Sequence, residues 1–347
     1  MIKISIAMAT YNGAQYINEQ LQSLVNQVRQ PDELVVCDDG STDETLLILE
    51  SFVPIAPFPV RIYRNEINLG YSDNFLKAAK LCKGDWIAFC DQDDVWLSDK
   101  IKTAVEAIDR HSGLKMVLQN AELCDGHLNR RGRVFPNKIK PGVYGSDSQY
   151  GFWVWPGFLK TVRADWVQMI DSVNRPLNYF LKPELQTHDK WTCMIANSLG
   201  DICVLAEPVA LYRRHEGALT GSYTGKSIRE RIDESKAVNA KHYRTLSEVA
   251  VYSGVYLERV SAEVTNQNWQ SALARSAKNF NRFADIQNER AALYESQDIA
   301  KRVACYMRIW RKGGYFGPRF RAMGMRSAGK DSVQLLCGSR IWEKKAK

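Results

Sequence analysis

This sequence of 347 residues lacks the features of several large protein classes. No apolar run reaches the 18 or so residues of a membrane-spanning helix, which argues against a polytopic membrane protein. Residues 1–8 contain no charged segment followed by a long apolar run, so no signal peptide is predicted. Hydrophobic residues make up 45% and charged residues 25% of the chain, values that are ordinary for a soluble globular protein.

Motifs for metals, disulfides and common nucleotide sites are also missing. The eight cysteines are scattered without a C-x-x-C pair, which predicts reduced thiols rather than a disulfide framework or a zinc site. No G-x-x-x-x-G-K-[ST] occurs, so a P-loop is excluded. No G-x-G-x-x-G follows the first predicted strand, which weakens the hypothesis of a dinucleotide-dependent dehydrogenase.

Positive charge is concentrated at the C-terminal end of the chain. The net charge is +8, but residues 301–347 alone carry 13 basic and 2 acidic residues, a net of +11, which leaves −3 on the rest. Aromatic and aliphatic residues such as Trp310 and Phe316 interleave with these cations. A solvated tail and a nucleic-acid arm are alternatives, but the mixture favours an anionic membrane surface, and no nucleic-acid motif accompanies it.

The first 110 residues alternate short apolar runs with segments of helical period. Runs at 2–9, 33–37, 60–63 and 86–90 predict buried strands, and the segments 16–28, 43–52 and 73–82 predict helices. This alternation is typical of βαβ units, so we expect an α/β fold with a Rossmann-like, mainly parallel sheet flanked by helices. Locally, Ser41 is predicted to open a capping box, and Gly84 to be the C′ residue that ends a helix.

The later part of the chain is less regular. Residues 111–150 predict irregular structure or short strands, followed by a helix near 188–198 and a strand near 202–206. From about residue 226 through 302 the pattern is helical. We therefore predict a catalytic domain over residues 1–225 and a helical, basic C-terminal extension over residues 226–347.

Polar clusters follow three of the predicted strands, where parallel sheets bind their ligands. The clusters are Thr10-Tyr11-Asn12-Gly13, Asp38-Asp39-Gly40-Ser41-Thr42-Asp43 and Asp91-Gln92-Asp93-Asp94. Two acidic clusters on one edge repel each other unless a cation or a ligand lies between them. The Asp91-x-Asp93 pair suits Mg²⁺ or Mn²⁺. The alternative interpretation is a turn in which Asp94 caps a following helix.

Taken in order, these motifs resemble those of the family 2 (GT-A fold) nucleotide-sugar glycosyltransferases. The matching segments are Ala9-Thr10-Tyr11-Asn12, Asp38 through Asp43, Asn68-Leu69-Gly70-x-x-x-Asn74 and Gly84 through Asp94. Two later segments resemble the bacterial rhamnosyl- and glucosyltransferase branch of surface polysaccharide synthesis: His188-Asp189-Lys190-Trp191 and Tyr212-Arg213-Arg214-His215. The resemblance covers roughly residues 1–220 and includes no motif in residues 226–347.

The resemblance implies a nucleotide-sugar site built from the early loops. The residues expected to contact the nucleotide sugar are Thr10, Tyr11, Asn12, Asp39, Asn68 and Asp91. Asp39 is expected to accept a hydrogen bond from N3–H of the base, which would favour uracil or thymine. Asp91 and Asp93 are expected to hold the divalent cation, Mn²⁺ or Mg²⁺, that bridges the diphosphate.

The later motifs imply the residues that meet the acceptor. Asp189 is the expected catalytic base, with a helix N-cap as the alternative from its position alone. His188 is expected to orient Asp189 or the acceptor. Arg213 and His215 are candidates for contact with the diphosphate or the acceptor, and a surface histidine is an equal alternative for His215. A glycine-containing segment, common in the family at this place, is present as Trp155-Pro156-Gly157-Phe158.

The implied activity is a metal-dependent, inverting transfer of a hexose (glucose, galactose or rhamnose) from a UDP- or dTDP-sugar. Such a transfer needs a general base that takes the proton of the acceptor hydroxyl. The expected acceptor is an undecaprenyl diphosphate-linked saccharide in O-antigen, lipopolysaccharide or other surface polysaccharide synthesis. The expected location is the cytoplasmic face of the cell membrane, with peripheral attachment. A non-catalytic sugar-nucleotide binding protein and a sugar nucleotidyltransferase remain alternatives.

Overall fold

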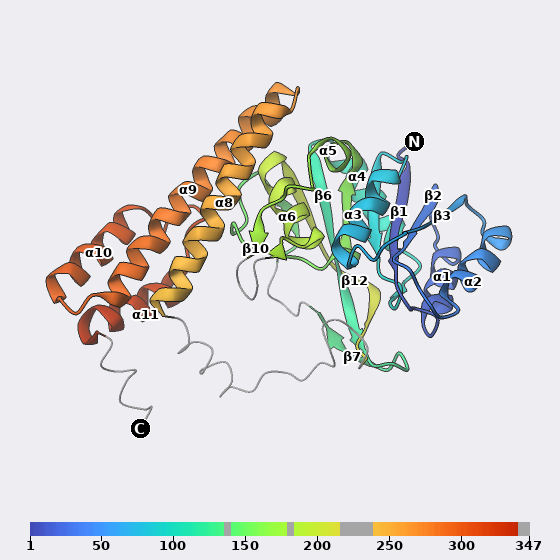
Figure 1. Cartoon of the computed structure of the whole chain (residues 1–347), viewed down its shortest axis with the longest axis horizontal. Helices are drawn as coiled ribbons and strands as arrows, with labels where there is room; N and C mark the ends of the chain where they lie inside the picture. Colours follow the sequence, from blue (N-terminus) through green and yellow to red (C-terminus); the bar gives the residue numbers. More distant parts are fainter. Residues whose placement is uncertain (135–139, 179–183, 216–238, 339–347) are drawn as a thin grey trace. The chain divides into compact units, whose positions relative to one another are not determined.

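The computed structural model describes residues 1–134, 140–178, 184–215 and 239–338. The chain divides into two compact units (Figure 1). The first, called the sheet unit, comprises Met1–Ser146, Val154–Val173 and Thr187–Tyr223. The second, called the helical unit, comprises Asp147–Trp153, Asn174–Gln186 and Thr224–Lys347. Within the described ranges, every helix is too short or too polar to cross a membrane.

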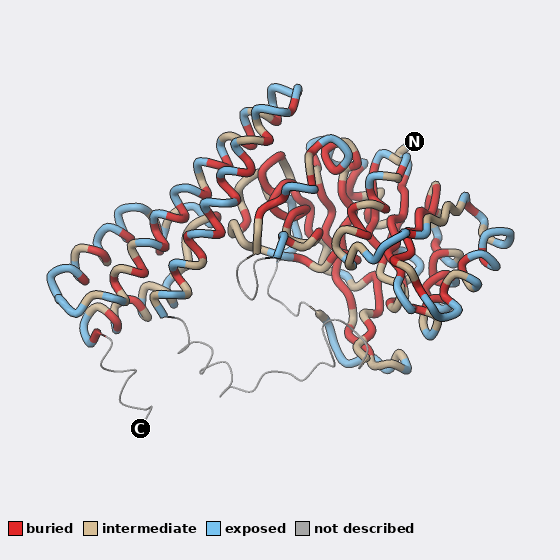
Figure 2. Tube along the Cα trace, in the orientation of Figure 1, coloured by how far each residue is buried: buried red, intermediate tan, exposed pale blue. Residues whose placement is uncertain are grey.

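The sheet unit begins with four parallel strands in the order β3-β2-β1-β4. Their bounds are β1 (Ile4–Thr10), β2 (Glu33–Asp38), β3 (Val60–Arg64) and β4 (Trp86–Cys90). All residues of β1, β2 and β4 are buried (Figure 2), as their continuous hydrophobicity predicts. The connecting helices are α1 (Ile17–Val25), α2 (Thr45–Phe52) and α3 (Tyr71–Leu81). The predicted α/β fold is confirmed over this part of the chain.

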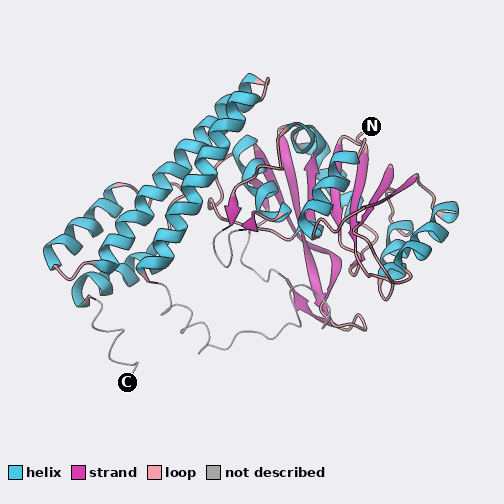
Figure 3. Cartoon of the chain, in the orientation of Figure 1, coloured by secondary structure: helices cyan, strands magenta, loops and turns pink. Residues whose placement is uncertain are grey.

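The rest of the sheet is mixed rather than mainly parallel (Figure 3). Strand β9 (Lys160–Arg163) pairs antiparallel with both β4 and β6 (Leu114–Cys124). Strand β6 in turn pairs parallel with β12 (Asp201–Arg213). Short strands complete this region: β5 (Val95–Trp96), β7 (Arg130–Arg133) and β8 (Gly142–Tyr144). The helices around it are α4 (Lys100–Arg110), α5 (Ala164–Met169) and α6 (His188–Leu199), with the 3₁₀ turns η1 (Val53–Ile55) and η2 (Gly157–Leu159).

The long strand β6 corrects the prediction of irregular structure or short strands over residues 111–150. Two polar residues, Gln119 and Asn120, interrupt its apolar pattern, although both are buried. The structure satisfies Gln119 with Lys100, whose ammonium donates to Gln119 Oε1 at 3.0 Å and whose carbonyl accepts from Gln119 Nε2 at 2.8 Å. A polar pair across the interior is invisible to a hydrophobic pattern, because each half looks like a surface residue.

Two local predictions about helix ends are wrong. Helix α2 begins at Thr45, and Ser41 instead donates its hydroxyl to Asp38, so it is no capping residue. Helix α3 ends at Leu81 with an extended residue after it, so Gly84 is not a C′ glycine. Gly84 is needed because two segments of the chain approach closely here: a Cβ atom at Gly84 would lie 2.6 Å from Ser5 Oγ.

The described part of the helical unit contains two long helices and two shorter ones. They are α8 (Ala240–Glu263), α9 (Gln267–Glu295), α10 (Ile299–Arg311) and α11 (Gly324–Cys337). Two short strands, β10 (Leu177–Asn178) and β11 (Glu184–Leu185), also belong to this unit. Part of its core is the cluster of Ile286, Leu293, Cys305, Ile309 and Tyr315. The predicted helical C-terminal region is confirmed for residues 240–337, whereas 226–238 lie outside the described residues.

The cysteines form no disulfide. All eight lie within the described ranges and are free thiols, seven of them buried and Cys337 exposed. Burial raises the pKa of most of them, for example that of Cys37 to about 11. The prediction of reduced thiols is confirmed.

Candidate active site

The first acidic loop follows β2 and is built around Asp38. Its carboxylate is fully buried and accepts hydrogen bonds from the backbone N–H groups of Gly40 and Ser41 and from the hydroxyl of Thr10. The hydroxyl of Ser41 donates as well. Every lone pair of Asp38 is therefore committed to the loop, and the residue positions its neighbours rather than a ligand.

Asp39 connects this loop to the loop that follows β3. Oδ1 accepts from Asn65 Nδ2 and from the backbone N–H of Leu69, both at 2.7 Å. Oδ2 accepts from the backbone N–H of Gly70 at 2.8 Å, where Gly70 has a φ of 78°, in the left-handed region that favours glycine. Because Oδ2 accepts only this one bond, it retains a lone pair for a further donor.

A cavity of about 620 Å³ opens beside Asp39. It is lined by Tyr11, Asp39, Gly40, Arg64, Asn65, Glu66, Ile67 and Asn68. The volume is in the range of small-molecule sites. The cavity therefore brings together residues from the ends of three neighbouring parallel strands, as the strand-end rule predicts.

The structure divides the residues predicted to contact the nucleotide sugar into two groups. Tyr11, Asp39 and Asn68 line the cavity. Thr10 and Asn12 do not: Thr10 is buried with its hydroxyl on Asp38, and Asn12 joins its side-chain oxygen to the backbone N–H of Thr42 at 2.9 Å.

Arg64 and Glu66 are two charged residues of the cavity that the sequence analysis missed. Both line it and both are exposed; Arg64 is the last residue of β3, and Glu66 follows the strand. Their place at the end of the third strand could have indicated them. They were missed because this strand end has no cluster of the kind that follows the first and second strands.

The second acidic loop, after β4, gathers three carboxylates. Oxygen atoms of Asp91, Asp93 and Asp94 lie within 4.8 Å of one another. Asp94 is fully buried; its Oδ1 accepts from the backbone N–H of Arg213 at 3.0 Å, while its Oδ2 has no hydrogen-bond donor among the described residues. Asp94 leads into strand β5, so its alternative interpretation as a helix cap is wrong.

This second loop is short of compensating charge. Burial and the neighbouring carboxylates Asp93 and Asp189 raise the pKa of Asp91 well above its usual range. Burial, Asp93 and Asp91 do the same to the pKa of Asp94, against the opposing effects of the Arg213 N–H and Lys100. Three converging oxygen ligands, one of them a buried atom without a donor, are a donor set that fits a hard divalent cation.

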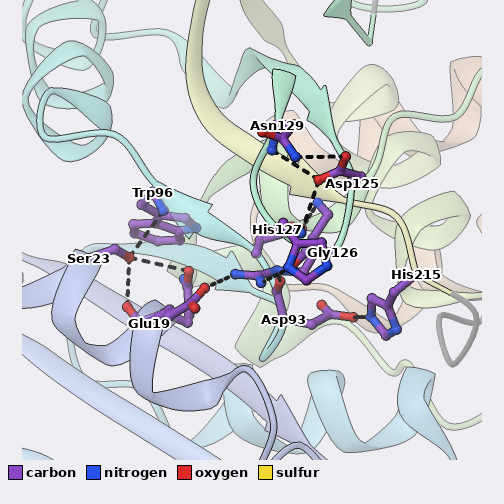
Figure 4. A network of polar contacts seen from close by, with 12 residues as sticks. Glu19, Ser23, Asp93, Trp96, Asp125, Gly126, His127, Asn129 and His215 are labelled. Atoms are coloured by element: carbon purple, nitrogen blue, oxygen red, sulfur yellow. Dashed lines mark hydrogen bonds and ion pairs between the residues drawn. The ribbon is translucent and has the colours of Figure 1, made fainter. Parts of the chain in front are cut away.

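His215 lies directly against this loop. Its Nε2 is 3.0 Å from Asp93 Oδ2, and Figure 4 shows the two side chains directed toward one another. The imidazole is 15% exposed, and its centroid is 4.5 Å from that of Tyr16. The structure therefore favours a role at the acidic loop over the alternative of a surface histidine.

Arg213 supports the acidic loop from below. Its guanidinium is 1% exposed and donates to the carbonyl oxygens of Asp93 (2.8 Å) and Gly126 (2.9 Å) and to the carboxylate of Glu19. It also lies over the ring of Tyr16. With its donors used in this way, Arg213 is placed to fix the backbone of the loop, which favours a positioning role over contact with a diphosphate.

A third set of charges surrounds Asp189, in the first turn of α6. Thr187, not Asp189, is the N-cap, and its hydroxyl accepts from the backbone N–H of Lys190. Asp189 Oδ1 lies 3.1 Å from His188 Nε2 and 3.4 Å from Lys160 Nζ. Burial opposes the charge of Asp189, but these two neighbours outweigh it and lower the pKa of Asp189 to about 2.

The surroundings of Asp189 are tightly packed. The ring of His188 stacks on Phe75 with centroids 4.4 Å apart. A Cβ atom on Gly157 would lie 2.5 Å from His188 Nε2 and 2.6 Å from Asp189 Oδ1. Gly157 thus explains the glycine-containing segment noted in the sequence: any side chain there would displace the pair.

One side chain connects the cavity to the acidic loop. Gln92 Oε1 accepts from the backbone N–H of Tyr11 at 2.9 Å, and Gln92 Nε2 donates to the carbonyl of Tyr11 at 3.0 Å. Asp91, beside Gln92, in turn feels the charge of Asp189. The cavity and the acidic loop are therefore joined through Gln92, and Asp189 acts on the loop through its charge.

Comparison with known sequences points to one family. Residues 5–155 match the family model described as Glycosyl transferase family 2. The chain is 40% identical over 105 residues to the dTDP-rhamnosyl transferase RfbG of Shigella flexneri, covering 29% of this chain and 36% of that protein. It is 25% identical over 148 residues to the putative glycosyltransferase EpsE of Bacillus subtilis, covering 43% and 53%. The chain thus spans between about a third and a half of the length of these relatives.

Solved structures share the fold over nearly the whole chain. The structure of S. aureus TarS 1-349 in complex with UDP-GlcNAc superposes with a TM-score of 0.54 at 21% identity, covering 91% of this chain and 93% of that one. The complex of TarS 1-349 with UDP gives a TM-score of 0.53 at 19% identity, with the same coverage. The match of residues 5–155 and this shared fold both support a resemblance to the family 2 glycosyltransferases and their GT-A-type sheet domain.

Proposed function

We propose that this protein catalyses the inverting transfer of a hexose from a UDP- or dTDP-sugar to a hydroxyl of a lipid-linked saccharide. The observation that carries the proposal is a set of three charge environments in the sheet unit. Asp39 lines a cavity, Asp91 and Asp93 belong to a cluster of three carboxylates, and the charge of Asp189, whose own pKa is lowered, helps to raise the pKa of Asp91. A nucleoside diphosphate-sugar likewise has three parts: a base, a diphosphate and a reacting carbon.

The base is proposed to occupy the cavity beside Asp39. The remaining lone pair of Asp39 Oδ2 can accept N3–H of uracil or thymine, whereas N3 of cytosine carries no hydrogen. Tyr11, which is 51% exposed at the cavity wall, offers an aromatic face for the base. The similarity to a dTDP-rhamnosyl transferase and to TarS in complex with UDP supports a pyrimidine nucleotide.

Asp91 and Asp93 would hold a divalent cation, Mn²⁺ or Mg²⁺, and Asp94 and His215 stand beside them. Such an ion, when bound, neutralises the charge that grows on the nucleoside diphosphate leaving group. Arg213 fixes the backbone position of Asp93, because its guanidinium donates a hydrogen bond to the carbonyl of Asp93. The hydrogen bond of His215 to Asp93 holds the carboxylate in one orientation.

Asp189 is proposed to accept the proton of the acceptor hydroxyl as that oxygen attacks the anomeric carbon. His188 and Lys160 keep it ionised at neutral pH, so it is ready to act as a base in every molecule. Its low pKa limits how far the proton transfers before the transition state, as expected when most of the driving force comes from departure of a stabilised diphosphate.

For the acceptor, we propose a saccharide carried on undecaprenyl diphosphate in O-antigen or other surface polysaccharide synthesis. The support is the similarity to RfbG together with the excess of basic residues at the C-terminal end. The same observations support peripheral attachment at the cytoplasmic face of the membrane.

A thermal-shift panel of UDP, dTDP, GDP and CDP, each with Mn²⁺, tests the nucleotide site. A ligand that binds the folded state at 100 times its Kd raises stability by about 2.7 kcal/mol, so UDP or dTDP should stand out. Asp93→Asn should lose the Mn²⁺-dependent part of the shift, and Asp99→Asn, at an exposed acid nearby, should keep it. Preference for GDP, or no shift with any nucleotide, would overturn the proposal.

Slow hydrolysis of UDP- or dTDP-sugar then separates an enzyme from a binding protein. The enzyme should release free nucleoside diphosphate in the presence of Mn²⁺, and Asp189→Asn should slow the release. A protein that binds the donor but releases nothing would be the non-catalytic alternative, and pyrophosphate released from a nucleoside triphosphate would indicate a nucleotidyltransferase.

A further inference from the structure

Helix α10 of the helical unit presents an apolar stripe to solvent. Ile299, Val303, Met307 and Trp310 are 55%, 45%, 47% and 54% exposed. Their spacing of four, four and three residues places them on one face of the helix. The packed face is a different one, with Cys305 and Ile309 in the core cluster of the unit. Exposed residues recur along this helix in Figure 2.

Helix α11 repeats the pattern. Met325, Val333 and Leu336 are 77%, 46% and 70% exposed, at the same relative positions as the first, third and fourth members of the α10 stripe. The two helices contact each other, for example through the hydroxyls of Tyr306 and Ser332 at 2.9 Å. Two adjoining helices thus each leave large apolar side chains in water, more than scattered surface residues would explain.

The charge around these stripes has one sign. From Ile299 to Gly338 the chain has nine Lys and Arg residues and one acid, Asp331. Asp331 is fully buried and pairs with Arg290, so it offsets no surface charge. Six of the cations are exposed: Lys301, Arg308, Arg311, Lys312, Arg319 and Arg326. Glu289 of α9 contacts two of them, Arg308 and Lys312, so nine cations face one surface acid in this group of described residues.

Helix α8 offers an internal comparison. Val251 and Val255 are 43% and 59% exposed, one turn apart on one face. Glu248 and Glu258 lie three residues before and after them, so this apolar face is bordered by acids. The surface of α10 and α11 differs from that of α8, because its exposed apolar side chains lie among an excess of cations.

We propose that the stripes on α10 and α11, with the cations beside them, form a binding surface for an anionic lipid bilayer. Apolar side chains at an interfacial helix enter the boundary between headgroups and acyl chains, and long Lys and Arg side chains reach the phosphates. Charge complementarity selects this occupant, because a second copy of the same face would bring cations against cations. The inference rests on the proposed function only in explaining why an enzyme with a lipid-linked acceptor would need such a surface.

Co-sedimentation of the full chain with vesicles tests the surface. The vesicles are phosphatidylcholine alone, or a mixture with about 30% phosphatidylglycerol. The protein should bind the anionic vesicles, and binding should weaken as NaCl rises, because salt screens the cations. The double variant V303E/M307E should bind about tenfold more weakly. The matched control V251E/V255E, which places the same change on α8, should bind like the wild type.

Two results would overturn the proposal: no binding of the wild type to anionic vesicles, or equal binding by V303E/M307E and the wild type. A change in oligomeric state of V303E/M307E, measured by light scattering without vesicles, with vesicle binding unaltered, would assign the stripe to contact between copies instead. The Mn²⁺-dependent shift with UDP or dTDP should be the same in both variants. If the wild type shows the nucleotide shift but does not bind anionic vesicles, the membrane surface is overturned and the proposed sugar transfer stands. If the wild type binds the vesicles but shows no nucleotide shift, the proposed sugar transfer is overturned and the membrane surface stands.

Discussion

The two acidic loops, after β2 and after β4, have similar composition but opposite electrostatics. The carboxylates of Asp38 and Asp39 accept seven hydrogen bonds from backbone and side-chain donors among the described residues. Asp91 and Asp94 lie in the other loop, where burial and neighbouring carboxylates raise the pKa of both. The first loop is internally satisfied and stabilises the fold, whereas the second stores repulsion that a cation would relieve. Asp189 is a third case, compensated by cations instead of donors.

The largest expected effect is a loss of turnover on substitution of Asp93, in the acidic loop after β4, or of Asp189, in α6. Asp93→Asn and Asp189→Asn should each lower the transfer rate about 10³-fold, or about 4 kcal/mol, because one removes a cation ligand and the other the base. Thermal unfolding should be nearly unchanged for Asp93→Asn, whereas Asp189→Asn should also lose some stability, because Asp189 pairs with the buried Lys160. Turnover within tenfold of the wild type in the folded variants would remove these residues from the mechanism.

In the loop after β2, substitution should lower the stability of the fold. Asp38→Ala leaves two backbone N–H groups and two hydroxyls without their acceptor in a fully buried place, and should cost about 3 kcal/mol of unfolding free energy. Chemical denaturation measures this change. A cost below about 1 kcal/mol would mean that water replaces the carboxylate and that the loop is more open than described.

Gly157→Ala should disturb the base without touching the metal ligands. The new methyl group would meet His188 and Asp189 at 2.5–2.6 Å, so the pair must shift. We expect a 10- to 100-fold loss of turnover, about 1.4–2.7 kcal/mol, with the nucleotide-induced thermal shift retained. Gly132→Ala, which has open space around its Cβ but a φ of 115°, is a control for backbone strain alone.

Lys160→Met tests the cationic compensation of Asp189 through pH. A lowered acid pKa contributes stability that is present above about pH 4 and is lost as the pH falls toward 2. Without Lys160 the pKa of Asp189 should rise, so the acidic limb of the rate profile should move to higher pH. Lys160→Arg keeps the charge and should restore the wild-type profile. Superimposable profiles for all three proteins would assign Lys160 a purely structural role.

The smallest expected effect is a gain in stability. Asp94→Asn removes one of three crowded charges while keeping the oxygen that accepts from the backbone of Arg213. In metal-free protein at neutral pH, unfolding free energy should rise by roughly 1 kcal/mol. The same substitution applied to Asp39 should lower stability, since its carboxylate accepts three hydrogen bonds that an amide matches only in part. Equal signs for the two variants would contradict the contrast between the loops.

Much of the sheet and of the motif set follows from the sequence. Strands β1, β2 and β4 are predicted within one or two residues, because a strand buried on both faces must be apolar throughout. Strand β3 is predicted in its place too, but the expectation that it is buried is wrong, since its residues are partly exposed. Asp39, Asn68 and the Asp91-x-Asp93 pair are found from their places at strand ends. The individual roles of the matched residues stay predictions until the variants above are measured.

The roles of several buried polar residues could not be predicted. Thr10 and Asn12 share a motif with Tyr11, yet only Tyr11 reaches the cavity, since a strand end alternates its side chains between interior and surface. Arg213 and His215 also share a motif but differ in surroundings: Arg213 is the buried last residue of β12, whereas His215 lies after the strand, beside Asp93. A motif fixes which residues are near a site but not which of them points into it.

By itself, the sequence determined the parallel βαβ core, the acidic strand ends and the cationic C-terminal end, because these depend on local composition and period. Only the tertiary structure decided which carboxylates are satisfied and which are not. The donors of Asp38 and Asp39 come from residues up to 31 positions away, and the cation beside Asp189 from β9, 29 positions away. Coulomb and hydrogen-bond energies depend on distance in space, and distance along the chain does not predict it.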